Sequence, residues 1–153
     1  MRVAEELRYL ILAIQRESNR LLAAELRPLG VTPSQAEVLR VLSDHQPLTL
    51  TALGELLVCE TGNSPSRLVD RLVAQGLVQR DTDSHDRRYV TLVLTADGTR
   101  LSRQISLVEE RLYGTIDNLV AGQPVDKALS MLRAVASAFP AGHAVARRRE
   151  NTE

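Results

Sequence analysis

The chain has 153 residues, a length typical of one domain, and its 19 basic and 19 acidic residues leave no net charge. A molecule that is basic all over is therefore excluded, and any signal for a nucleic-acid partner must be local. Aromatic residues make up 3% of the chain, which argues against a platform that stacks single-stranded bases. Cys59 is the only cysteine, so an internal disulfide framework and a C-x-x-C metal site are excluded.

The apolar run YLILAI near the N-terminus is too short to span a membrane, because Gln15 and Arg16 end it. No small-residue cleavage site follows, so we expect no secretory signal. These features predict a cytoplasmic protein with no membrane partner.

Residues 3–29 are predicted to form one long helix, along which apolar side chains recur at helical spacing. Leu12 and Ala13 widen this apolar stripe beyond one face. A helix that is apolar over more than one face packs against more than one neighbour. Pro28 and Gly30 are expected to end the helix.

The next segments predict two short helices. Thr32 is expected to cap the first, with Pro33 at its first position and Gln35 as the capping-box partner. After a short extended link, Thr51 is expected to cap the second, which spans barely two turns.

The stretch CETGNSP is predicted to be a turn that leads into a third short helix. Ser64 is its expected N-cap, Pro65 its first residue and Gly76 its C-cap. The apolar residues from Leu68 to Val73 face inward, whereas the serines and arginines of this helix face outward.

A hairpin follows, with strands at about residues 77–82 and 88–94 and a turn rich in Asp, Ser and His. Thr95 then caps a long helix. Its apolar residues are spaced almost as heptads: Leu101, Ile105, Val108, Leu112, Ile116 and Leu119.

The sequence GQP at 122–124 breaks the long helix, and a last helix follows it as far as Phe139. Residues 141–153 lack apolar periodicity and are expected to be a flexible tail. The fold class is therefore mainly α with a small β-hairpin wing. We expect a single domain over 1–140, in which a winged helix-turn-helix (about 32–98) is flanked by long helices (about 3–29 and 96–139).

The helix that follows the turn has an outer face suited to DNA. Ser64 and Ser66 are small and polar, and Arg67 and Arg71 lie one turn apart. A helix N-terminus offers free N–H groups to phosphate, and small residues let a helix enter the major groove, where Arg67 could reach a guanine edge. The alternative is an ordinary solvated helix face that carries two arginines.

Arg87 and Arg88 lie just past the hairpin turn, and Asp86 could hold one of them in a bidentate pair. An arginine fixed at a hairpin tip suits the minor groove. The alternative is a weak surface salt bridge on a loop.

The run DRRYVTLVLTADG resembles the wing signature of the MarR family: Asp, any residue, Arg, five residues, Leu-Thr, two residues, Gly. Asp86, Arg88, Leu94, Thr95 and Gly98 occupy these places. The similarity extends over about residues 47–98, and the order of helices agrees over about residues 1–140.

This resemblance implies a homodimeric, ligand-responsive repressor that binds double-stranded DNA at a pseudo-palindromic operator. It implies that Arg88 enters the minor groove and that Asp86 orients it. The signature leaves the position of Arg87 open, and we expect Arg87 to meet a phosphate. It also implies dimerisation through the terminal helices, and a small, frequently aromatic and acidic effector. The alternative from another class is an interaction module that kept the fold and lost DNA binding.

Cys59 suggests a thiol-responsive regulator, although a small half-buried residue is the simpler interpretation. His85 with Asp83 and Asp86 could suggest a metal, but three neighbours on one turn rarely converge on one ion. No nucleophile–base pair and no phosphate-binding glycine loop is evident in the sequence. We therefore expect no enzyme, no cofactor and no metal.

Overall fold

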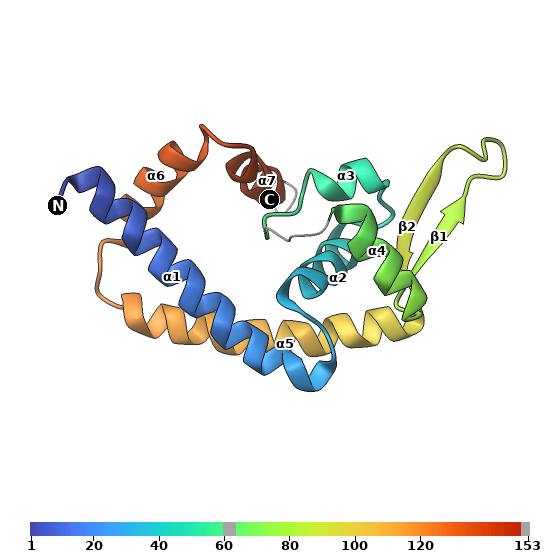
Figure 1. Cartoon of the computed structure of the whole chain (residues 1–153), viewed down its shortest axis with the longest axis horizontal. Helices are drawn as coiled ribbons and strands as arrows, with labels where there is room; N and C mark the ends of the chain where they lie inside the picture. Colours follow the sequence, from blue (N-terminus) through green and yellow to red (C-terminus); the bar gives the residue numbers. More distant parts are fainter. Residues whose placement is uncertain (60–63, 151–153) are drawn as a thin grey trace.

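The computed structural model describes residues 1–59 and 64–150. Two long helices, α1 (Val3–Leu26) and α5 (Ala96–Val120), pack against each other and carry the other elements (Figure 1). The rest, in chain order, are η1 (Arg27–Leu29), α2 (Pro33–His45), α3 (Leu50–Gly54), α4 (Pro65–Ala74), β1 (Val78–Thr82), β2 (Val90–Leu94), α6 (Val125–Ala136) and α7 (Pro140–Glu150). The predicted class, a mainly helical protein with one small hairpin, is confirmed.

Most helix starts follow the capping residues predicted from the sequence. Gln35 N donates to Thr32 Oγ1 at 3.3 Å, and Thr32 N donates to Gln35 Oε1 at 3.0 Å, which completes the expected capping box of α2. Gly98 N donates to Thr95 Oγ1 at 3.0 Å at the start of α5. Ser64 is the N-cap of α4, with Pro65 at the first position.

The start of α3 differs from the prediction. Thr49, and not Thr51, is the N-cap, because its hydroxyl accepts from Ala52 N at 3.1 Å. The reason is that Leu48 is held in a β-bridge with Leu92, so the extended link ends there and the helix begins two residues early. The turn expected in CETGNSP falls largely on residues 60–63, which lie outside the described residues.

The core of the winged module lies where α2, α4, the hairpin and the first half of α5 meet. The inward residues predicted for α4 are buried, with Val73 half-buried. The largest buried side chains are Leu26, Leu39, Leu42, Leu53, Leu72 and Ile105. Full burial of such a side chain contributes about 1.5–3 kcal/mol, so this cluster fixes how the helices are oriented.

The hairpin pairs β1 with β2 in antiparallel register, from Val78 opposite Leu94 to Thr82 opposite Val90. Its tip projects away from the helices (Figure 1). Arg88 precedes β2, so the second strand begins two residues later than predicted. The tip is closed by backbone hydrogen bonds from Asp83 N to Tyr89 O and from Tyr89 N to Asp86 O, both of 3.0 Å.

The apolar spacing predicted for α5 divides into two halves. Ile105 and Val108 are buried in the winged module, whereas Leu119 is 76% exposed. The distal half of α5, the outer face of α1 and the apolar side of α6 are uncovered in the single chain. We call these surfaces together the apolar face; it comprises Val3, Leu10, Ile14, Ile116, Leu119, Leu129, Leu132 and Val135.

A helix replaces the flexible tail expected after Pro140. Residues Pro140–Glu150 form α7, and Ala144 within it is buried. The sequence lacks apolar periodicity here because α7 is held mainly by arginine contacts to distant residues. Among the described residues, no helix is both long and apolar enough to cross a membrane.

Gly98, in the first turn of α5, lies against Leu77, which connects α4 to β1. A Cβ atom at this position would lie 1.9 Å from the carbonyl oxygen of Leu77, a backbone atom. The same carbonyl accepts a hydrogen bond from Thr95 N at 3.1 Å, so this close approach joins the hairpin to α5.

We therefore expect Gly98→Ala to lower the free energy of unfolding by about 1–3 kcal/mol or more, because the clash forces the backbone to move. Gly114→Ala is the matched control in the same helix, since its Cβ would meet nothing within 4 Å. The control should be stabilising by roughly 0.5–1 kcal/mol. Urea unfolding of both variants measures the difference, and equal stabilities would contradict the close approach.

Candidate nucleic-acid interface

Helix α4 is divided along its length into a buried side and an exposed side. Leu68, Val69 and Leu72 are buried against the core. Ser64, Ser66, Arg67, Asp70 and Arg71 are all exposed. At 100° per residue these five positions fall on one half of the helix, so the predicted outward set does share a surface.

The first turn of α4 presents small polar groups. The Ser64 and Ser66 hydroxyls lie 3.1 Å apart, and the Ser64 side chain makes no cap hydrogen bond. Pro65 has no N–H, and the backbone N of Arg67 donates to Ser64 O at 3.1 Å. Within the described part of the chain, the side chains of Arg67 and Arg71 make no hydrogen bond or ion pair, so their guanidinium groups are available to an anion.

Arg80 of β1 forms an ion pair with Asp70 on α4. The pair links the exposed side of α4 to the wing. It also compensates the negative charge of Asp70, the one carboxylate on that side. Sequence reasoning missed Arg80. Both residues face outward in their own elements, but only the packing of β1 beside α4 brings them together.

At the hairpin tip, Asp86 holds Arg88 through three hydrogen bonds. Arg88 Nε lies 3.1 Å from Asp86 Oδ1, Arg88 Nη2 lies 3.4 Å from Oδ2, and the backbone N of Arg88 donates to Oδ1 at 3.0 Å. The Arg88 side chain is nevertheless 93% exposed. The pairing expected of Asp86 is thus present, and it selects Arg88 rather than the neighbouring Arg87, which is also exposed.

The turn itself is held by a second carboxylate. Asp83 Oδ1 accepts from His85 N at 2.7 Å and from Asp86 N at 3.1 Å. The side-chain and backbone hydrogen bonds from Arg88 hold the pKa of the Asp86 carboxyl below its usual value. Asp86 therefore stays ionised at neutral pH and keeps its hold on the guanidinium.

The surroundings of Cys59 are the reverse of those of a reactive cysteine. Cys59 is exposed at the protein surface, yet partial desolvation of its thiol, reinforced by the nearby Glu37 carboxylate, raises the pKa of Cys59 to about 12. A thiol with this pKa is protonated at neutral pH and is a poor nucleophile. The interpretation of Cys59 as a sensor gains no support from its environment.

The exposed serine–arginine face and the arginine-bearing wing define a winged helix-turn-helix of the DNA-binding class, and comparison with known proteins agrees. The family described as a winged helix DNA-binding domain matches residues 31–98. The multiple antibiotic resistance protein MarR of Escherichia coli is 33% identical over 116 residues, which cover 74% of this chain and 80% of that protein.

Two further comparisons extend this likeness. The organic hydroperoxide resistance transcriptional regulator of Bacillus subtilis is 31% identical over 68% of this chain and 70% of its own length. The structure of an E. coli MarR mutant complexed with operator DNA superimposes with a TM-score of 0.74 and 29% identity, over 85% of this chain and 93% of that one. The chain belongs to the MarR family and is a DNA-binding transcriptional regulator of the MarR type.

The lowered pKa of Asp86 yields a test of the wing. A depressed carboxyl pKa means that the ion pair with Arg88 is fully formed above the ordinary Asp pKa and is lost as the pH falls through the lowered value. We expect Arg88→Ala to raise the pKa of Asp86 toward its ordinary value, whereas Arg87→Ala leaves it where it is. A carboxyl-carbon NMR titration measures the pKa of Asp86 in both variants. A pKa of Asp86 that does not change in Arg88→Ala would show that the ion pair is absent in solution.

Proposed function

We propose that the protein is a homodimeric, ligand-responsive repressor that binds a pseudo-palindromic operator. The observation that carries this proposal is the wing, where the almost fully exposed Arg88 donates three hydrogen bonds to the Asp86 carboxylate, two from its guanidinium and one from its backbone N. An arginine fixed in this way loses little further entropy when it binds.

The exposed half of α4 suits the major groove. Ser64 and Ser66 are small enough for the N-terminus of the helix to approach the DNA closely, and their hydroxyl groups can donate to phosphates. Arg67 is placed to read a base edge, and Arg71 lies one turn further on. At the wing, Arg88 takes the minor groove, oriented by Asp86, while Arg87 meets the backbone.

The apolar face supports a dimer. Ile14 is 66% exposed and Leu119 is 76% exposed in the single chain, and both belong to long helices outside the winged module. An uncovered apolar surface of this extent marks an interface with another protein. A second copy of the chain would cover α1, the distal half of α5 and α6 at once, and its two-fold axis would match the symmetry of the operator.

The effector binds in a cavity of about 380 Å³ between α1, α2, α5 and α7. Its charged lining residues are Glu37, Asp44, Glu109, Glu110, Arg40 and Arg148. Arg40 Nε is already paired with Glu109 at 3.0 Å, and Arg148 with Glu37. Carboxylates thus outnumber guanidinium groups, which favours a positively charged effector over the aromatic acid that the family resemblance suggests.

Two probes of the same shape test this preference. Benzylamine should raise the melting temperature of the protein, and Glu110→Gln should reduce that rise. Benzoate should have the smaller effect. A larger rise in melting temperature with benzoate than with benzylamine would favour an aromatic acid as the effector.

The other functions are weaker. An interaction module that had lost DNA binding would give no reason for the ion pair between Asp86 and Arg88 or for the exposed arginines on α4. A thiol-responsive regulator would need a Cys59 with a lowered pKa, and the pKa is raised. We also propose that the protein is not an enzyme and acts in the cytoplasm, as expected of a transcriptional regulator.

The roles of Arg67 and Arg88 can be separated by titrating operators changed one base pair at a time, at fixed salt. Arg67→Ala should weaken binding by about 1–3 kcal/mol and relax selectivity at one base pair of each half-site, because it removes a major-groove contact. Arg88→Ala should weaken binding to all these operators alike, because the minor groove is read by width. Asp86→Ala should reproduce part of that loss.

Arg103→Ala is the matched control for these variants. Arg103 is exposed on α5 and belongs neither to α4 nor to the hairpin, so its loss removes one positive charge without touching the proposed contacts. It should change affinity little. An Arg67→Ala variant that weakens every sequence equally would reduce Arg67 to a phosphate contact, and an Arg88→Ala variant without effect would favour the interaction module.

The dimer can be tested by one substitution on the apolar face. Ile14→Glu should produce a monomer that still folds, because the side chain contributes little to the core of the single chain but would place a charge in the interface. Arg16→Glu is the control on the opposite side of α1 and should stay dimeric. Light scattering at micromolar concentration reports the mass, and a monomeric wild type would exclude the dimer.

A further inference from the structure

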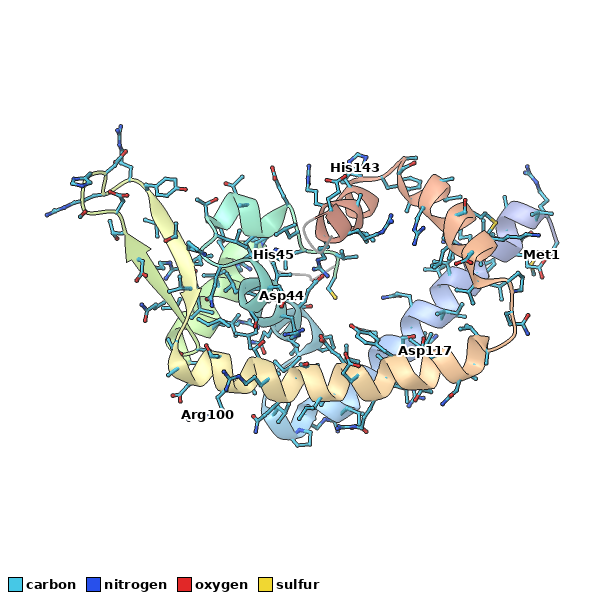
Figure 2. The ribbon with its side chains drawn as sticks, turned by 180° about the vertical axis from the view of Figure 1, so that it is seen from behind. Met1, Asp44, His45, Arg100, Asp117 and His143 are labelled. Atoms are coloured by element: carbon cyan, nitrogen blue, oxygen red, sulfur yellow. The ribbon has the colours of Figure 1, made fainter. Side chains whose placement is uncertain are left out.

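The C-terminal helix α7 contacts the helix-turn-helix through two consecutive arginines. Arg147 Nη1 donates to Glu55 O at 3.2 Å, and Arg148 Nε donates to Leu56 O at 2.7 Å. Both acceptors are carbonyl groups at the end of α3 that no longer have a partner within that helix. In both views α7, which carries His143, lies beside the winged module and apart from the distal end of α5 that carries Asp117 (Figures 1 and 2).

Arg148 also pairs with Glu37 of α2. The Glu37 side chain is only 9% exposed, and its two oxygens also accept from the backbone N–H groups of Val58 and Cys59, each at 2.8 Å. A nearly buried carboxylate needs such partners, because an uncompensated charge there is strongly unfavourable. Glu37 therefore joins three parts of the chain: α2, the segment after α3, and α7.

The end of α3 lies next to Pro65, the first residue of α4. A Cβ atom at Gly54 would lie 3.7 Å from Pro65 Cγ, which is ordinary van der Waals contact. The groups that α7 binds are thus one contact away from the N-terminus of α4, where Ser64 and Ser66 lie. A movement of α3 relative to α2 would be felt there directly.

We propose that Arg148 is a positioning residue for DNA binding: through Glu37 and Leu56 O it fixes the end of α3 against α2, and thereby sets where the N-terminus of α4 meets the DNA. The proposal rests on the proposed DNA-binding role of α4. It also gives α6 a route to the DNA surface, because α7 follows α6 after three residues and α6 carries part of the apolar face.

The test compares Arg148→Met with Arg149→Met. Both remove one guanidinium from α7, but Arg149 is exposed and makes no hydrogen bond or ion pair within the described residues. Binding is measured on a DNA sequence that the wild-type dimer selects from a random pool, at fixed salt and at a temperature where both variants are folded. Arg148→Met should bind about tenfold more weakly than wild type, and Arg149→Met should stay within about twofold.

Amide hydrogen exchange gives a readout that does not depend on DNA. The Val58 and Cys59 amides should exchange faster in Arg148→Met and at the wild-type rate in Arg149→Met, because only the first loosens the Glu37 carboxylate. In a Glu37→Gln background, Arg148→Met should lose most of its effect on DNA binding, since the two residues act as one unit. A purely stabilising role would lower the melting temperature but leave this coupling absent.

Each outcome decides the matter. Equal DNA affinity of the two variants, or an undiminished effect of Arg148→Met in the Glu37→Gln background, would overturn the positioning role. If Arg148→Met does not fold, Arg148→Lys keeps the charge beside Glu37 but replaces the planar fork, and a DNA affinity equal to wild type despite faster exchange at Val58 would equally overturn it. Failure of the wild type to select any DNA would instead count against the proposed function, and the exchange measurements would still test the contact.

Discussion

The burial of one side of α4 determines where its other side points. Leu68, Val69 and Leu72 lock the helix against the core, so its exposed serines and arginines cannot rotate away from a common surface. The hairpin depends on the same anchorage, because β1 follows α4 directly and Arg80 returns to Asp70 on it. The close approach of Gly98 to Leu77 then fixes α5 behind both. The helix and the wing are thus held as one unit by core packing together with the ion pair between Arg80 and Asp70.

Much of this could be predicted from the sequence because the signals are local. Thr32 and Gln35 form a capping box within one turn, Thr95 caps α5, and the spacing of Asp86 and Arg88 places a carboxylate and a guanidinium at the same tip. These capping hydrogen bonds and the Asp86–Arg88 pair each join residues no more than three positions apart along the chain. Apolar periodicity likewise indicated the buried side of α4, since a helix places every third or fourth residue on one face.

The rest could not be predicted, because it depends on residues that are distant in sequence. Leu48 ends the link before α3 by pairing with Leu92, and this moves the cap from Thr51 to Thr49. Glu37 looks like an ordinary helix-surface acid in the sequence, yet it is nearly buried because α7 returns to cover it. The arginines of α7 gave no apolar pattern, so the segment was expected to be a tail. Its order comes from hydrogen bonds to carbonyl groups that only the fold exposes.

The exposed cations of α4 and the wing are all arginines, and Lys127 in α6 is the only lysine of the chain. Arginine keeps its proton at any physiological pH, so the charge of these side chains does not vary with acidity. It is also beyond the reach of lysine acetylation, which elsewhere can neutralise a DNA-binding surface. For the experimenter, amine-directed labels would leave the DNA surface intact and attach, apart from the amino terminus, at one place only, beside the apolar face.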